Sequence, residues 1–144
     1  MAPTSKKVLT ASAGAFRFQY AAKFICTSNI PGTLQTTSSF LPGNYQTVVN
    51  IHNPSENLVK LRMKMAIADG PISKWVARAL KDDEVTKVDC SMISDPFGLT
   101  PIHGFEGFFV VESTRSIDVV AVYTAGKDSV TSIDVESIRE RRIR

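Results

Sequence analysis

The sequence has no long apolar segment and few of the residues that mark a local chemical site. No run approaches the ~20 apolar residues that a helix needs to cross a bilayer, so we expect no membrane insertion. There are two histidines and two cysteines, and the eight glycines lie singly rather than in a phosphate-binding loop. The sequence therefore predicts no metal site, no cofactor and no nucleotide-binding motif.

The composition is that of an ordinary globular domain. Of 144 residues, 43% are hydrophobic and 22% are charged, and this length suits one domain with a core of its own. The formal net charge is +3, and the segment Ile138–Arg144 alone supplies charge of that size because it holds four arginines and one glutamate. The rest of the chain is close to neutral, so no nucleic-acid partner is expected.

The two ends of the chain differ in pattern from the middle. Lys6 and Lys7 precede a segment that is too short and too polar for an export signal, so we expect a cytoplasmic protein with a mobile arm over residues 1–15. Residues 16–138 are expected to form the folded domain. Residues 139–144 are expected to be a basic tail that is solvated, or that pairs with acidic residues such as Asp82, Asp83 and Glu84.

Alternation of apolar and polar residues is the main pattern, and it is typical of half-buried strands. The segments that alternate in this way are Phe16–Cys26, Tyr45–Ile51, Leu58–Ala68, Val85–Cys90 and Val130–Ile138. Ile72–Leu80 fits either a short helix or a strand, and a strand paired with Val85–Cys90 is favoured. The pattern leaves Thr33–Gly43 as a loop or a short edge strand, and Ser91–Pro96 is expected to form a single helical turn.

Two stretches are predicted to be β-hairpins. In Gly107–Gly126, two apolar runs flank a short polar break, so both arms are expected in the middle of a sheet with both faces covered. Tyr45–Ala68 has two alternating arms around the turn-forming Asn53-Pro54. Seven or eight short strands without a helical period predict an all-β protein, an antiparallel β-sandwich of immunoglobulin-like size and layout.

The two cysteines allow two interpretations. Cys26 and Cys90 can form a disulfide between sheets, or they can be buried thiols that pack as small hydrophobic groups. The expected absence of export favours the thiols.

Several motifs resemble a family of small bacterial β-sandwich proteins whose members have no assigned activity. The motifs are His52-Asn53-Pro54, Val88-Asp89-Cys90, Gly107–Ser113, Ile117–Ala125 and Ser132–Glu136. More distantly, Ile93–Pro96 and Phe108–Val122 are similar to the cyanobacterial sensory rhodopsin transducer. That second resemblance implies an oligomeric β-sandwich that passes signals through protein contacts.

The residue types that carry catalysis are sparse. His52 precedes a turn, and His103 lies in a loop rich in glycine and proline, too far away in sequence for a local metal motif. A nucleophile and base built from Cys90, His103 and Asp89 has no supporting local signature. We therefore expect no catalytic residues.

Two sets of residues are candidates for contacts with a partner. Phe109, Val120 and Val122 are expected on the second face of the central hairpin, where a second copy of the chain would bury them. Lys60, Arg62 and Lys64 project from one face of a strand, either as a solvated outer face or toward an anionic partner. These sets favour a non-enzymatic interaction or structural module that forms a homo-oligomer. The alternative is a small-ligand-binding protein or enzyme with its site at the Phe97–Phe105 loop.

Overall fold

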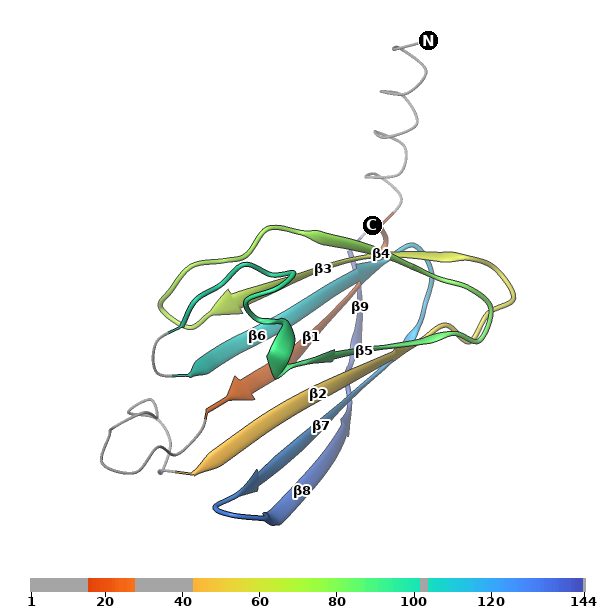
Figure 1. Ribbon diagram of the computed structural model, residues 1–144. Coiled ribbons are helices and arrows are strands. Elements are labelled where there is room, and N and C mark those ends of the chain that lie inside the picture. The colour runs from red at the N-terminus through yellow and green to blue at the C-terminus, as the bar shows by residue number, and fades with distance from the viewer. Residues whose placement is uncertain (1–15, 28–42, 102–103, 144) are drawn as a thin grey trace.

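The computed structural model describes residues 16–27, 43–101 and 104–143. Its strands form two antiparallel sheets that pack as a sandwich, so the predicted fold class is confirmed (Figure 1). The first sheet has the order β4 (Val76–Leu80), β3 (Val59–Ile67), β6 (Phe105–Ser113), β1 (Phe18–Cys26) and β9 (Glu140–Arg142). The second sheet has the order β5 (Val85–Asp89), β2 (Asn44–His52), β7 (Asp118–Gly126) and β8 (Val130–Ser137).

The core lies between the sheets and follows from the alternation. Successive side chains of a strand point to opposite faces, so the apolar set of each strand faces the opposite sheet. Phe24 packs edge-to-face on Phe105 with ring centroids 5.8 Å apart, and Phe97 packs on Phe109 in the same way at 6.3 Å. Full burial of each such ring contributes about 1.5–3 kcal/mol to folding.

The predicted hairpins are wrong, although the strands themselves exist. β6 and β7 lie in the interior of different sheets, as do β2 and β3, so neither pair is hydrogen-bonded together. β4 and β5 do not pair with each other either, because β4 pairs with β3 in one sheet and β5 pairs with β2 in the other. The polar connections 53–58, 81–84 and 114–117 instead carry the chain from one sheet to the other. We call the end of the sandwich formed by these three connections the crossover end.

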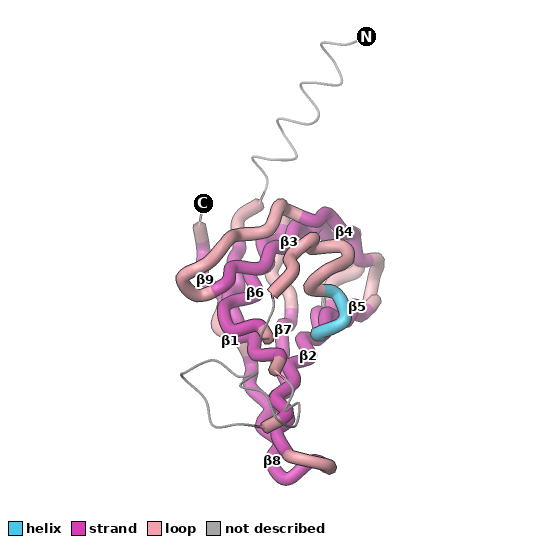
Figure 2. The backbone as a smooth tube through the Cα atoms, turned by 60° about the vertical axis from the view of Figure 1, so that its left-hand side comes forward, coloured by secondary structure: helices cyan, strands magenta, loops and turns pink. Residues whose placement is uncertain are grey.

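Three further segments answer open points of the sequence. β4 shows that the second half of the 72–80 segment is a strand and excludes the helix there. A 3-10 turn, η1 (Cys90–Met92), follows β5 (Figure 2). The Asp89 side chain caps it by accepting a hydrogen bond from the Ser91 backbone N–H. Most of Thr33–Gly43, the arm 1–15 and His103 lie outside the described residues.

The basic tail is not a solvated extension. Glu140–Arg142 pairs with the first residues of β1 and forms one edge of the five-stranded sheet, so the domain extends past residue 138. The Tyr20 hydroxyl donates to Glu140 Oε1 at 2.6 Å and accepts a hydrogen bond from the backbone N–H of Ile117 at 2.9 Å. Burial, followed by the Glu140 hydrogen bond, raises the pKa of Tyr20 to about 12. This hydroxyl therefore ties β1, β9 and the crossover end together.

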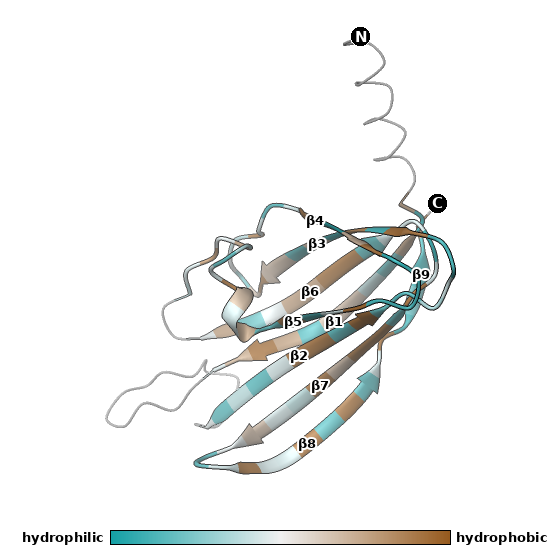
Figure 3. Cartoon of the chain, turned by 45° about the vertical axis from the view of Figure 1, so that its right-hand side comes forward, coloured by the Kyte–Doolittle hydropathy of each residue, from teal (hydrophilic) through white to brown (hydrophobic). Residues whose placement is uncertain are grey.

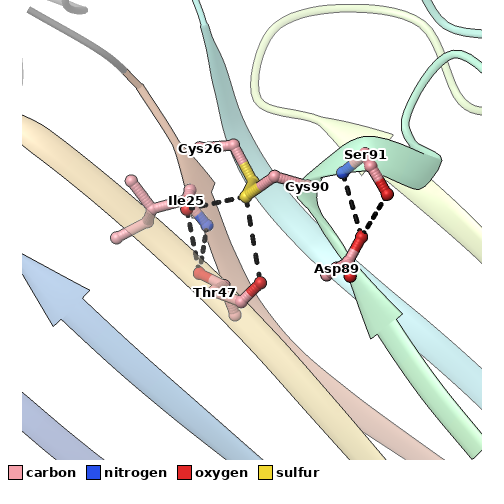
Figure 4. Close-up of a disulfide and its surroundings, with 6 residues drawn as sticks. All are labelled: Ile25, Cys26, Thr47, Asp89, Cys90 and Ser91. Atoms are coloured by element: carbon pink, nitrogen blue, oxygen red, sulfur yellow. Dashed lines mark hydrogen bonds between the residues drawn. A yellow bond between two sulfur atoms is a disulfide. The ribbon is translucent and has the colours of Figure 1, made fainter.

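Cys26 and Cys90 form a disulfide, so the favoured interpretation as two free thiols is wrong. Their Cα atoms are 5.8 Å apart, and the bridge joins the end of β1 in one sheet to η1 just after β5 in the other (Figure 4). Beside it, the Thr47 hydroxyl donates to the Ile25 carbonyl and accepts from the Ile25 N–H, both at 2.9 Å. These polar contacts and the disulfide fasten the two sheets at the same place.

Candidate functional site

An apolar strip crosses the outer face of the four-stranded sheet. Val48, Val122 and Val135 are directly opposite one another on β2, β7 and β8. Their sequence neighbours Val49 and Ala121 are fully buried in the core, so alternation directs Val48 and Val122 away from it. We call Val48, Val120, Val122, Ile133 and Val135 the outer apolar strip. Of these, Val120 and Val122 were predicted, and they are half-buried on the outer face.

Strand β8 reverses the polarity expected of a sandwich strand. Ile133 and Val135 project on the outer face and are 65% and 63% exposed. Ser132, Asp134 and Glu136 alternate with them and face the other side, beside β7 residues whose side chains point inward. The alternation is visible along β8 in Figure 3. Contiguous exposed apolar residues are a common feature of interaction surfaces, so this strip is the candidate site.

The placement of Phe109 on the outer face is wrong. Phe109 is fully buried in the core, whereas its neighbour Phe108 is 47% exposed. The run Phe108–Val111 is apolar at every position, so the sequence contains no alternation that fixes which residues face inward. By contrast, Val48 lies in an alternating segment, and its outer placement follows once Val49 faces inward. Ile133 and Val135 also alternate with polar residues, but that pattern predicts an inward apolar face, so their exposure was not predictable from the sequence.

The cationic row on β3 is engaged within the chain. Arg62 donates two hydrogen bonds to Glu112 Oε1, at 2.8 and 2.6 Å, and the second Glu112 oxygen accepts from Gln19 at 2.9 Å. The Arg62 guanidinium also lies 4.4 Å from the centre of the Trp75 ring, and Lys64 Nζ lies at the same distance. Lys60 is exposed near the crossover end. Arg62 therefore helps to hold the outer face of the five-stranded sheet together.

His52 is a polar link at the crossover end. Its Nδ1 lies 2.8 Å from Asp118 Oδ2 on β7, and its Nε2 lies 2.6 Å from Asp83 Oδ1 in the connection between β4 and β5. Asp83 has a left-handed backbone with φ of 61°, which aspartate tolerates. The hydrogen bonds to Asp118 and Asp83 raise the pKa of His52 above its ordinary value of 6.5, because the protonated ring donates to both carboxylates.

We expect this link to make stability depend on pH. Because the folded-state pKa of His52 is raised, its contribution is fully present below about pH 6.5 and is lost as the pH rises through the folded-state value. Urea unfolding of the wild type and of His52→Gln between pH 5.5 and 9 measures it. The difference in free energy of unfolding between the two proteins should shrink with rising pH. A difference that stays constant or grows over this range would contradict the assignment.

The alternative site near the Phe97–Phe105 loop receives no support. The sulfur of Cys90 is bonded to Cys26, so it is not a thiolate nucleophile, and Asp89 accepts hydrogen bonds from the N–H and hydroxyl of Ser91. Phe97 and Leu99 are buried in the core. Among the described residues, no three His, Cys, Asp or Glu side chains are placed to hold a metal ion. Residues 16–27, 43–101 and 104–143 also contain no helix that is long and apolar enough to cross a membrane.

These features define an antiparallel β-sandwich whose sheets are joined by a disulfide and which carries an apolar strip on one outer face. No family model and no curated protein matches the chain. Its fold is similar to that of the crystal structure of Thermotoga maritima 1070, with a TM-score of 0.58 and 10% sequence identity. The similarity covers 86% of this chain and 93% of that one, and it concerns the fold alone.

Proposed function

We propose that the protein is a non-enzymatic protein–protein interaction module that self-associates through β8 and the outer apolar strip. The observation that carries the proposal is the exposure of Ile133 and Val135 beside the half-buried Val122 on an outer sheet face. A large side chain of this kind gains about 1.5–3 kcal/mol when it leaves water. A second copy whose strip packs beside this one would remove part of this apolar area from water in both subunits.

The free edge of β8 favours a second copy that pairs strand to strand. The Ile138 N–H donates to the Val119 carbonyl, so every second residue before Ile138 on β8 bonds to β7. The backbone groups of Ile133 and Val135 therefore point to the edge, where no strand of the described chain pairs with them. β8 has no lysine or proline, residues that commonly block such edges.

Charge selects the register of this pairing. Two antiparallel β8 strands whose strips meet have Ile133, Asp134 or Val135 at the two-fold axis, and with Val135 there Asp134 lies opposite Glu136. The second arrangement places Asp134 opposite Asp134, and like charges directly opposite are unfavourable. We therefore assign the two-fold axis to Ile133, which places Val135 opposite Thr131 of the other copy. The strips of both subunits then form one continuous band.

Sedimentation or light scattering at tens of micromolar protein tests the proposal. The wild type is expected at about twice the chain mass of 15.8 kDa. The double variant Ile133→Lys, Val135→Lys should be monomeric, with the dissociation constant raised at least about tenfold, since apolar cross-strand contacts are lost and like charges face each other across the two-fold axis. The matched control is Val85→Lys, because Val85 is an exposed valine on β5, the other edge of the same sheet.

Two outcomes would refute this assignment. A monomeric wild type at these concentrations removes the self-association. A dimer that Val85→Lys weakens as strongly as the β8 variant does would place the contact away from β8. Circular dichroism of each variant shows whether the fold is retained.

The compartment is part of the same proposal. Structural disulfides persist in oxidising surroundings and are rare in the cytosol. The Cys26–Cys90 bridge therefore supports an exported protein over the cytoplasmic location expected from the N-terminal sequence. Non-reducing mass spectrometry of the protein from its native source decides between the two, because a cytoplasmic protein would carry two free thiols.

A further inference from the structure

Arginines that are far apart in the sequence gather around β9. Five of the eight arginines line two adjoining open depressions at one edge of the five-stranded sheet. These five are Arg17, Arg115, Arg139, Arg141 and Arg142. Among the described residues that line the two depressions, Glu140 is the one with a carboxylate side chain. The sequence shows only a basic tail, because Arg17 and Arg115 join the cluster through the fold.

The first depression lies at the crossover end and has a volume of about 540 Å³. Arg17 is placed there by backbone hydrogen bonds to Ser113 and Ile143, and Arg115 lies in the connection between β6 and β7. Arg142 enters from β9, so three separate segments each supply a guanidinium. In the described part of the chain, neither Arg17 nor Arg115 forms an ion pair. Both are therefore available to an external anion.

A hydroxyl group adds a donor to the first depression. The Thr114 oxygen already accepts from the Lys60 N–H at 3.1 Å, so its own proton is available to a ligand. Planar guanidinium groups bind phosphate-type oxyanions through paired hydrogen bonds. The three guanidinium groups and the Thr114 hydroxyl around this open pocket are the kinds of hydrogen-bond donor that bind the oxygens of a phosphate group.

The second depression lies on the outer face of the five-stranded sheet and has a volume of about 1000 Å³. Arg142 borders both depressions, Arg139 and Arg141 line this one, and the exposed ring of Phe108 forms part of its floor. The Glu140 carboxylate is engaged within the chain, because it accepts hydrogen bonds from the hydroxyls of Tyr20 and Ser116. A ligand that fills both depressions carries more than one negative group.

From these contacts we infer that the arginine cluster binds a chain of phosphate groups. The ligand is either a free inorganic polyphosphate or the backbone of a single-stranded nucleic acid. The basic tail itself has no aromatic residues between its arginines. The fold supplies one from elsewhere, since Phe108, which is 47% exposed, shares a depression with Arg139. Phe18 is partly buried against the core, with Arg142 5.7 Å from its ring. Exposed aromatic rings beside a cationic groove stack bases in single-strand binders.

The inference does not rest on self-association, because the cluster lies within one copy and on the sheet that does not contain β8. Isothermal titration of the purified chain with tripolyphosphate, and with a short single-stranded oligothymidine, tests it at about 50 and 150 mM salt. Arg17→Gln and Arg115→Gln should each weaken tripolyphosphate binding about tenfold or more. Arg78→Gln, an exposed arginine on the far edge strand β4, should leave it unchanged.

The two ligands distinguish the source of the phosphates. If a nucleic acid is bound, Phe108→Ala weakens the oligonucleotide and leaves tripolyphosphate unaffected. If free polyphosphate is the ligand, Phe108→Ala affects neither and tripolyphosphate binds more tightly per phosphate. Absence of binding to both at 50 mM salt would overturn the inference. An Arg78→Gln effect equal to that of Arg115→Gln would also overturn it, since it would indicate general electrostatic attraction.

Discussion

Reduction of the Cys26–Cys90 disulfide is expected to lower the free energy of unfolding by about 4 kcal/mol. The bridge spans 64 residues of sequence, and cross-linking a loop of that length removes many conformations from the unfolded chain. For a chain of this size the loss corresponds to a fall of roughly 10 °C in the unfolding midpoint. Thermal unfolding followed by circular dichroism, with and without a phosphine reductant, measures it.

The double variant Cys26→Ala, Cys90→Ala is the control for the effect of the reductant itself. It should unfold near the midpoint of the reduced wild type and should not respond to the reductant. The assignment fails if fully reduced wild-type protein keeps its midpoint. It also fails if native protein, denatured without reductant, shows two titratable thiols.

The strands were predictable because their signal is local. Alternation along residues 16–26, 45–51, 58–68 and 130–138 places strands there, and β1, β2, β3 and β8 occupy most of those residues. Which strand pairs with which was not predictable in the same way. A polar connection of four to six residues fits a hairpin within one sheet and a crossover between sheets equally well, and alternation says nothing of the partner.

The candidate site was predictable only in part, for a related physical reason. Val120 and Val122 were placed on the second face of a predicted hairpin; that hairpin does not form, and the two residues lie half-buried on the outer face of the four-stranded sheet. Phe109 was misplaced because four consecutive apolar residues show no alternation. Which of them face the core therefore depended on packing, which the sequence does not show. The arginine cluster was missed because Arg17, Arg115 and Arg142 meet only after β1, β6 and β9 have paired. Sites that the topology assembles leave no local pattern in the sequence.

The crossovers depend on a buried asparagine that the sequence marked only as a turn. Asn53 is fully buried, and its amide donates to the carbonyls of Asn57, Leu80 and Lys81 at 2.8, 3.1 and 3.0 Å. Its side-chain oxygen accepts from the N–H and the hydroxyl of Ser55. One side chain thus joins the connection between β2 and β3 to the connection between β4 and β5. The chain passes between the two sheets in opposite directions in these two connections.

Asn53→Ala is therefore expected to lower the free energy of unfolding by about 3 kcal/mol. The variant removes the hydrogen bonds of the buried amide to three carbonyls and to Ser55, and each lost bond of this kind costs about 0.5–1.5 kcal/mol. Asn53→Asp should destabilise at least as much, because it removes the donors and places a charge against carbonyl oxygens. Urea unfolding measures both variants.

Asn57→Ala provides the matched control, since Asn57 is exposed in the same connection and takes part through its backbone. That variant should change the free energy of unfolding by less than about 0.5 kcal/mol. Equal losses for Asn53→Ala and Asn57→Ala would show that the connection tolerates replacement of either side chain, and that the crossovers are held by their backbone bonds. If Asn53→Asp lowered the free energy of unfolding only slightly, the stabilisation would come from the side-chain oxygen, which accepts hydrogen bonds from Ser55.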